Sequence, residues 1–259
     1  MLGELHVLIL GGTTEARLLA ERLAGDRTIA PILSLAGRTK NPTLPAIPFR
    51  IGGFGGIGGL ISYLRAQSID LVIDATHPFA EQMSAHAEIA CRQTHVPLVL
   101  FTRPPWQPSE GDRWSEVVDA DAAAHALGAA PRRVFLTVGR LQLPAFEAAP
   151  IHHYLIRSID KPEPLPKLPN YHLLLARGPF SLDDEMRLME TEGIEILVTK
   201  NSGGDATYAK IEAARKLGIS VILMRPPARA DVPTFHDLEA LLAFIHDAAH
   251  QRVPEPRGV

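Results

Sequence analysis

The stretch HVLILGGTTEARLLAERLA, residues 6–24, constrains the fold more than any other part of the chain. An apolar run leads directly into two glycines, and a helix-length segment follows them. Small and apolar residues of that segment recur at helical spacing: Ala16, Leu19, Ala20 and Leu23. A strand, a tight turn and an amphipathic helix in this order predict a βαβ unit and therefore a parallel sheet.

Strand-sized and helix-sized segments continue to alternate as far as about Arg103. The first predicted strand is His6–Leu10, and the next ones are Ile29–Leu35, Ile47–Ile51, Leu71–Ala75 and Leu98–Phe101. The predicted helices are Thr14–Ala24, Gly56–Gln67 and Ala80–Gln93. The proline-rich stretch RPPWQPSEGDRW, residues 103–114, interrupts this pattern, and we interpret it as a connector.

After the connector the alternation resumes. The predicted strands are Arg133–Val138, His152–Ile156, His172–Ala176, Ile196–Thr199 and Ser220–Met224. The predicted helices are Asp119–Leu127, Ser181–Glu192, Ala206–Leu217 and Thr234–Ala249. We therefore expect two similar α/β domains with parallel sheets, the first over residues 1–104 and the second over residues 115–259.

Composition excludes several classes of function. The formal net charge of −3 gives no support for a nucleic-acid-binding protein or a polybasic membrane protein. One cysteine, Cys91, can form neither an internal disulfide nor a cysteine-rich metal site, so we expect a cytoplasmic protein without a bound metal. The longest apolar runs are strand-sized, and we expect no membrane-spanning segment. The oligomeric state is left open.

The first glycine turn is a candidate phosphate-binding site. A helix amino terminus offers unpaired N–H groups and a partial positive charge, and Gly11 and Gly12 allow a pyrophosphate to approach the backbone. Thr13 and Thr14 add hydroxyl groups, and Thr14 is a candidate helix cap. Glu15 completes this candidate set. An ordinary strand–helix turn with a threonine cap is the competing interpretation.

The end of the second predicted strand favours NADP over NAD. In a Rossmann-type unit the residue after this strand meets the adenosine ribose, where an acidic residue selects NAD and a basic one accommodates the 2′-phosphate of NADP. The sequence here is SLAGRTK, residues 34–40, which contains no acid. The candidate cofactor-binding residues are Ser34, Gly37, Arg38 and Thr39, and the Arg38 guanidinium is suited to a forked phosphate contact. A solvated basic loop is the alternative.

Two further stretches of the first half are candidates for ligand contact. The stretch GGFGGIGG, residues 52–59, holds six glycines in eight residues, which indicates close backbone approach or a flexible loop. The stretch DATHPFAE, residues 74–81, follows a predicted strand at the edge where open α/β sheets bind ligands. It supplies Thr76, His77 and Pro78 as candidate cofactor contacts, and His77 is also a candidate proton donor or a helix cap.

In the second half, polar turns follow three predicted strands: TVGR at 137–140, ARGPFS at 176–181 and VTKNSGG at 198–204. Three cations at one sheet edge indicate a polyanionic ligand, although any one of them alone fits a surface residue. The candidate ligand-binding residues are Gly139, Arg140, Arg177, Lys200, Asn201, Ser202 and Gly203. Tyr208 precedes Lys210 by two residues, which does not fit the Tyr-x-x-x-Lys spacing of short-chain dehydrogenases.

Four motifs in this order, ILGGTTEARLLAERL, DATHPFA, TVGR and VTKNSGG, resemble the precorrin-6A reductase family of cobalamin biosynthesis. The resemblance extends from residue 5 to about residue 245, and the pairing of GGTTEA with DATHPFA is its most specific part. It implies two Rossmann-like domains with an interdomain cleft. It also implies an NADPH-dependent oxidoreductase that transfers a hydride to the tetrapyrrole precorrin-6A and yields precorrin-6B.

The resemblance also implies roles for the candidate residues. The many carboxylates of precorrin-6A match the cationic edge of the second half, and NADPH matches residues 34–40. His77, Lys200 and Tyr208 are the candidate proton donors, although the conjugated acceptor could take its proton from water. Relatives of the anaerobic route act on a cobalt-containing substrate, and the motifs do not separate the two routes. The alternatives are an NADP-dependent dehydrogenase of another small molecule and a non-catalytic dinucleotide sensor.

Overall fold

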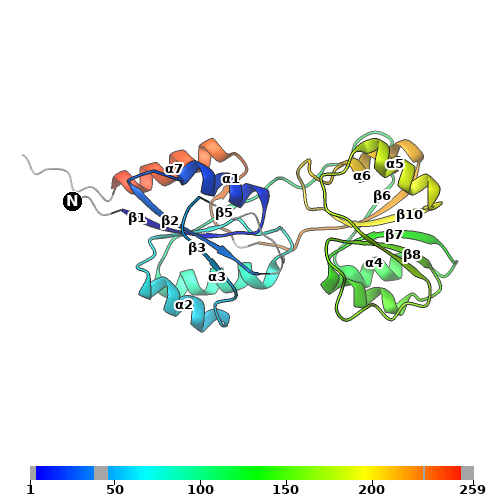
Figure 1. Ribbon diagram of the computed structural model, residues 1–259, viewed down its shortest axis with the longest axis horizontal. Helices are drawn as coiled ribbons and strands as arrows, with labels where there is room; N and C mark the ends of the chain where they lie inside the picture. Colours follow the sequence, from blue (N-terminus) through cyan, green and yellow to red (C-terminus); the bar gives the residue numbers. More distant parts are fainter. Residues whose placement is uncertain (1–3, 38–45, 230, 252–259) are drawn as a thin grey trace, which may run out of the picture. The chain divides into compact units, whose positions relative to one another are not determined.

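The computed structural model describes residues 4–37, 46–229 and 231–251. The chain divides into two compact units, which we call the first and second domains (Figure 1). The first domain comprises Met1–Arg103 and Ala228–Val259, and the second comprises Pro104–Pro227. The expected boundary of 115–259 for the second domain is therefore wrong at both ends. The chain returns to the first domain because its last helix covers that domain's core.

The first domain contains a six-stranded, fully parallel sheet in the order β12-β5-β4-β1-β2-β3. This is the Rossmann strand order, with the sixth position filled by a strand from the carboxyl end of the chain. The strands are β1 (Leu5–Leu10), β2 (Ile29–Leu35), β3 (Phe49–Ile51), β4 (Leu71–Asp74), β5 (Leu98–Phe101) and β12 (Thr234–Phe235).

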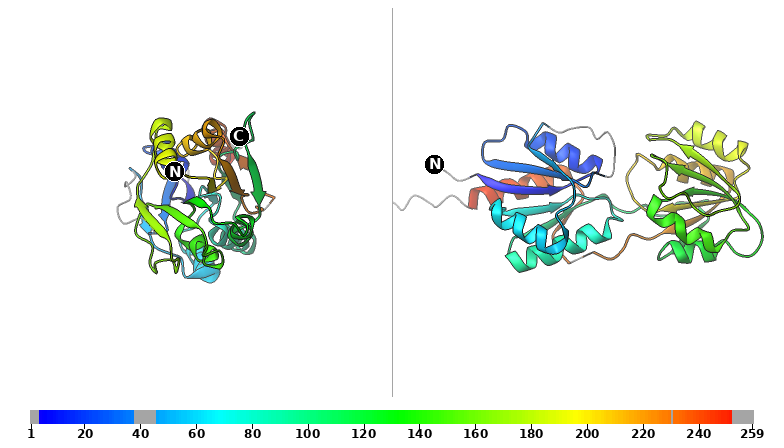
Figure 2. Two further views of the ribbon diagram at one scale, coloured as in Figure 1. Left: turned by 90° about the vertical axis from the view of Figure 1, so that its right-hand side faces the viewer. Right: turned by 60° about the horizontal axis from the view of Figure 1, so that its bottom comes forward.

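Helices cover both faces of this sheet (Figures 1 and 2). One face packs against α1 (Thr14–Leu23) and α7 (Leu238–Gln251), and the other packs against α2 (Gly56–Ala66) and α3 (Glu81–Thr94). Leu241 and Ile245 of α7 are fully buried together with Val7 and Ile9 of β1. The central strands are covered on both sides, which explains why they are continuous apolar runs.

The second domain has the same kind of sheet, in the order β6-β11-β10-β7-β8-β9, again fully parallel. Its strands are β6 (Trp114–Val117), β7 (Arg133–Thr137), β8 (His153–Ser158), β9 (Tyr171–Leu175), β10 (Ile196–Lys200) and β11 (Ser220–Met224). The helices are α4 (Ala120–Ala126), α5 (Leu182–Thr191), α6 (Ala209–Leu217) and the 3-10 helix η1 (Arg140–Ala148). Buried residues of α5 and α6 pack on one face of the sheet.

The predicted α/β class and parallel sheets are confirmed, and three elements differ from expectation. The two edge strands β6 and β12 were assigned to a connector and to the start of a helix. Both are short and partly exposed, so neither gives an apolar run. The third element, η1, begins at Arg140, the last residue of TVGR. Among the described residues, no helix is long and apolar enough to cross a membrane.

Candidate functional site

The turn after β1 is built to leave an open approach to the backbone. Gly12 has a φ of +117° and is exposed, and a Cβ added to it would meet no atom within 4 Å. Gly11 is packed instead, because a Cβ there would lie 2.6 Å from Cδ1 of Leu33. A residue with a side chain would be strained at position 12, whereas at position 11 it would require the Leu33 side chain to move.

Thr13 caps the helix that follows this turn. Its hydroxyl oxygen accepts a hydrogen bond from the Ala16 amide at 3.1 Å, and the hydroxyl donates to the carbonyl of Ala75 at 2.7 Å. The sequence interpretation named Thr14 as a cap, whereas Thr14 is the first residue of α1. The Thr13 hydroxyl thus joins the carboxyl ends of β1 and β4, the two strands at which the strand order reverses.

Glu15, another predicted contact, lies in the first turn of α1 and forms an ion pair with Arg103. The Nη1 atom of Arg103 lies 3.1 Å from the Glu15 carboxylate, and both side chains are mostly buried. This pair connects the amino terminus of α1 to the segment after β5. Since Glu15 has a cationic partner, its carboxylate is partly neutralised beside the glycine turn.

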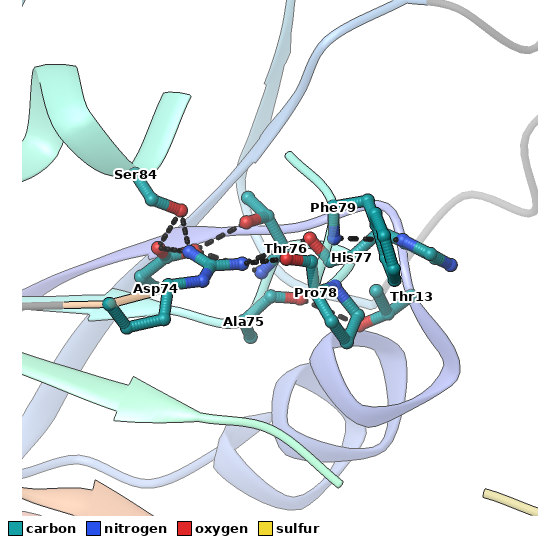
Figure 3. A network of polar contacts seen from close by, with 9 residues as sticks. Thr13, Asp74, Ala75, Thr76, His77, Pro78, Phe79 and Ser84 are labelled. Atoms are coloured by element: carbon teal, nitrogen blue, oxygen red, sulfur yellow. Dashed lines mark hydrogen bonds and ion pairs between the residues drawn. The ribbon is translucent and has the colours of Figure 1, made fainter. Parts of the chain in front are cut away.

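A network centred on Asp74 shapes the turn after β4 (Figure 3). The Asp74 carboxylate is 2% exposed and accepts hydrogen bonds from the Thr76 amide at 3.0 Å and the Thr76 hydroxyl at 2.6 Å. It also accepts from the Ser84 hydroxyl of α3 and forms an ion pair with Arg229 at 3.0 Å. Buried charge is thereby matched with a cation and several donors, as burial of a carboxylate requires.

Arg229 was not recognised in the sequence, because it lies 155 residues from Asp74 and belongs to the returning segment. Its guanidinium also donates to the carbonyl oxygens of His77 at 3.1 Å and of Pro78 at 3.0 Å. The returning chain therefore fixes the main chain of the predicted cofactor-binding turn. A cavity of about 140 Å³ lies beside this network, lined in part by Asp74, Glu88 and Arg229.

His77 is half-buried, and its Nδ1 atom accepts a hydrogen bond from the Phe79 amide at 3.2 Å. The two rings lie 5.9 Å apart, centroid to centroid. An accepting Nδ1 places the proton of a neutral imidazole on Nε2. The Nε2–H group is then a donor whose position is set by the Asp74 network. The helix-cap alternative is wrong, since α3 begins only at Glu81 and its cap residue is Ala80.

At the end of β2, Ser34 is buried and its hydroxyl accepts a hydrogen bond from Arg50 of β3 at 2.8 Å. Gly37 has a φ of +72° and is exposed. Arg38 and Thr39 lie outside the described residues, so their predicted cofactor contacts stay predictions. Arg50 is a cation at this strand end that the sequence interpretation did not select.

The six glycines of residues 52–59 serve different purposes. Gly59 is a packing residue, because a Cβ there would lie 1.6 Å from the carbonyl oxygen of Phe54. Gly55 and Gly56 have φ values of +83° and +82°, and a Cβ at either would meet nothing within 4 Å. One part of the stretch therefore allows α2 to pack closely, and the preceding part forms an open turn.

In the second domain, the carboxyl ends of β7 and β10 come together at the point where the strand order reverses. Nζ of Lys200 lies 3.2 Å from the position of a Cβ on Gly139, and Oε1 of Gln142 lies 2.9 Å from it. Gly139 therefore leaves room for the Lys200 ammonium group. Gln142, on η1, was not predicted, because no helical pattern is recognisable in the sequence around it.

The loop after β10 is held in place by the connector. The side-chain amide of Asn201 accepts a hydrogen bond from the Trp106 amide at 2.7 Å and donates to the Trp106 carbonyl at 2.9 Å. The Trp106 indole N–H donates to the Gly204 carbonyl at 2.8 Å. Asn201 is 3% exposed and has a structural role in this loop, and its predicted ligand contact stays a prediction. Ser202 is also buried, and Gly203 has a φ of +65°.

The remaining predicted residues lie at the same edge in different settings. Arg140 and Arg177 are exposed, the first at the start of η1 and the second after β9. The oxygen of Tyr208 accepts a hydrogen bond from Arg215 at 2.6 Å, and its ring packs 5.8 Å from Trp106. The phenol is thus part of a structural cluster. Among the described residues, no group of three or more His, Cys, Asp or Glu side chains is placed to hold a metal ion.

The thiol of Cys91 is unsuited to nucleophilic chemistry. Burial and the nearby Asp74 charge raise its pKa to about 12, so the thiolate form is scarce at neutral pH.

The first domain thus has an open glycine turn and a fixed polar turn, and the second domain has a cationic sheet edge. These features fit binding of a dinucleotide and of an anion.

Comparison with known proteins decides the family. A family model described as precorrin-6x reductase CbiJ/CobK matches residues 6–246. The chain belongs to the precorrin-6x reductase family. Precorrin-6A reductase of Rhodobacter capsulatus is 48% identical to this family member over 255 residues, covering 98% of this chain and 99% of the relative. The enzyme of the same name from Sinorhizobium sp is 50% identical over 242 residues, 93% of each chain.

A solved structure named CobK precorrin-6A reductase matches this precorrin-6x reductase family member with a TM-score of 0.86. The two chains are 47% identical, and the match covers 98% of this chain and 99% of that one. Cobalt-precorrin-6A reductase of Priestia megaterium is 26% identical over 237 residues, 85% of this chain and 90% of the relative. The predicted family and Rossmann-like fold are therefore confirmed.

Proposed function

We propose that this protein reduces precorrin-6A to precorrin-6B with NADPH, as a cytoplasmic enzyme of cobalamin biosynthesis. The observation that carries the proposal is the near-complete match to precorrin-6A reductases at 48% and 50% identity. The metal-free substrate is favoured over the cobalt-containing one, because the cobalt-precorrin-6A reductases of three organisms are only 26–28% identical.

The first domain has the features that a bound NADPH requires. Open space at Gly12 and the capped amino terminus of α1 suit the diphosphate, whose charge the helix dipole stabilises. Thr76, His77 and Pro78 line the neighbouring strand end. The nicotinamide ring supplies the hydride when the cofactor is bound. Arg38 and Thr39 belong to the proposal as contacts of the 2′-phosphate, and Ser34 and Gly37 as contacts of the ribose.

The second domain is proposed to bind the carboxylates of the tetrapyrrole. Lys200 lies next to Gly139, while Arg140 and Arg177 are exposed at the same sheet edge. Cations of this kind form charge-assisted hydrogen bonds with carboxylates. Ser202 and Gly203 are proposed to shape the loop, and Asn201 to hold it against Trp106. A small neutral substrate would not need such an edge.

For the proton that the macrocycle takes up, we propose His77 or Lys200 as donor. The imidazole Nε2–H is oriented by the Phe79 amide on Nδ1. Lys200 carries an ammonium group at the reversal point of the second sheet. Tyr208 is left out, because its ring and its oxygen are both engaged within the Trp106 and Arg215 cluster.

The direct test is the visible spectrum of precorrin-6A mixed with the purified protein and NADPH. Reduction of the conjugated ring is expected to shift or bleach the absorption bands while NADPH absorption falls in equal amount. An unchanged spectrum from protein that binds NADPH would remove the proposal. In the same assay Arg38→Ala is expected to weaken NADPH far more than NADH, and equal weakening would refute the proposed 2′-phosphate contact.

A further inference from the structure

Arg50 is a cation with an unusual environment at the end of β3. It lies beside Ser34 in the parallel register of β2 and β3. Its guanidinium donates to the Ser34 hydroxyl at 2.8 Å and to the carbonyl oxygens of Gly52 and Gly53, both at 2.9 Å. All three acceptors are neutral.

Aromatic rings fix the same guanidinium from one side. Its central carbon lies 3.9 Å from the centroid of Phe54 and 5.4 Å from that of Tyr63, and these two rings pack edge to face. A guanidinium held by a ring and three acceptors loses little further freedom when it binds a ligand. Arg50 is therefore preorganised, and it is only partly buried.

The charge of Arg50 has no carboxylate partner among the described residues. In contrast, five other arginines of this domain each form an ion pair with an aspartate or a glutamate. The segment 38–45, which continues the chain after β2, contains no acidic residue in its sequence. A half-buried guanidinium surrounded only by neutral acceptors favours binding of an anion.

The position of this cation identifies the anion. The end of β2 is where a Rossmann sheet meets the adenosine ribose, and the 2′-phosphate is the group that distinguishes NADP from NAD there. Ser34 accepts from Arg50, so its own hydroxyl hydrogen is left to donate to the ribose or its phosphate. We propose that Arg50, with Ser34, contributes to the preference of this enzyme for NADPH over NADH; this inference rests on the proposed function.

The test compares the dissociation constants of NADP⁺ and NAD⁺ by calorimetric titration, which needs no tetrapyrrole. Arg50→Met removes the charge and keeps most of the side-chain length. We expect it to weaken NADP⁺ by about tenfold or more, and NAD⁺ by less than about threefold. Arg50→Lys, which keeps the charge without the fork, is expected to give an intermediate preference.

Arg65→Met is the matched control, because Arg65 is an exposed arginine near the end of α2 in the same domain. It is expected to leave both dissociation constants unchanged. Equal weakening of NADP⁺ and NAD⁺ by Arg50→Met would assign Arg50 to loop packing alone and overturn the inference. Unchanged binding of both dinucleotides would overturn it as well. If wild-type protein bound neither dinucleotide, the proposed function itself would fail. Thermal melting of each variant verifies that it is folded.

Discussion

Asp74 is nearly inaccessible to solvent, yet it organises the polar edge of the first domain. Its carboxylate accepts hydrogen bonds from Thr76 and Ser84 and pairs with Arg229, which in turn binds the carbonyl oxygens of two residues in the same turn. A buried carboxylate with this many partners mainly fixes the conformation of the turn. It adds little net stability, since the cost of its desolvation offsets much of the attraction to its partners. Its removal would nevertheless leave the arginine without its counter-charge.

Asp74→Asn is therefore expected to lower the free energy of unfolding by about 3 kcal/mol, because Arg229 would stay partly buried without an anion. Urea denaturation measures the loss. The control is Glu88→Gln, which breaks the exposed pair with Arg92 on α3 and is expected to change stability by less than about 0.5 kcal/mol. If Asp74→Asn lowered stability no more than Glu88→Gln does, the Asp74 network would be dispensable.

His152 gives the second domain a dependence on pH. Its ring is fully buried and packs edge to face with Tyr154, and burial together with the nearby Arg132 charge lowers the pKa of the imidazole. Below the ordinary histidine pKa of about 6.5, the unfolded chain takes up a proton that the folded chain resists. Stability is therefore present above that pH and is lost as the pH falls through it.

We expect the free energy of unfolding to fall between about pH 7 and pH 5.5, with a contribution from His152 of at most about 1.4 kcal/mol per pH unit. His152→Phe keeps a ring against Tyr154 and removes the titrating group. Denaturation at both pH values is expected to show a smaller fall for this variant. A wild-type slope retained in full would exclude His152 as its source.

At the scale of elements, the packing of α2 depends on one glycine among several. Gly58 and Gly59 are neighbours in the same helix, but a Cβ at Gly59 would overlap the Phe54 carbonyl, whereas a Cβ at Gly58 would meet nothing within 4 Å. The helix can approach Phe54 only because position 59 has no side chain.

Gly59→Ala is expected to destabilise the protein by about 3 kcal/mol, because the Phe54 backbone must move to admit a methyl group. Gly58→Ala is the paired control and is expected to stabilise by about 0.5–1 kcal/mol, since alanine has the higher helix propensity. Chemical denaturation of both variants measures the difference, and a tolerated Gly59→Ala would contradict the close packing described above.

Elements buried on two faces could be predicted from the sequence, since covering helices make them continuous apolar runs. For this reason Leu98–Phe101 was predicted with its observed bounds, and the prediction for β4 extended only one residue beyond Asp74. The glycine turn could be predicted because its chemistry is local. Edge strands such as β12 could not, because a strand of two residues exists only through its pairing with β5.

The candidate site was predictable to the same extent. Residues at or just after strand ends, such as Gly12, His77 and Lys200, could be selected as candidates because parallel strands end at one edge. Arg229 and Trp106 act on such turns from proline-rich segments far away in the sequence. No local pattern indicates which turn such a residue contacts, so only the folded chain reveals them.

At the scale of the whole molecule, the second domain is inserted into the first, between β5 and β12. The first domain therefore completes its sheet and its core with residues from the end of the chain. Leu241, Leu242 and Ile245 of α7 are buried in the same cluster as Leu19 of α1. Loss of that helix would expose the part of this sheet face that α1 does not cover.

A protein truncated after residue 227 is accordingly expected to lose NADPH binding and to aggregate, because the apolar surface covered by α7 becomes exposed. Truncation after residue 251 is the control and is expected to leave binding and stability unchanged. Calorimetric titration with NADPH and size-exclusion chromatography distinguish the two. Tight binding by the protein ending at residue 227 would show that α7 is not needed.

The same insertion dictates the order in which the two domains can mature on the ribosome. Translation proceeds at about 5–20 residues per second, so the inserted domain delays the missing strand and helix by on the order of ten seconds. During that interval the newly made amino-terminal part of the first domain lacks its last strand and last helix, while the inserted domain is being synthesised. The first domain begins first and is finished last.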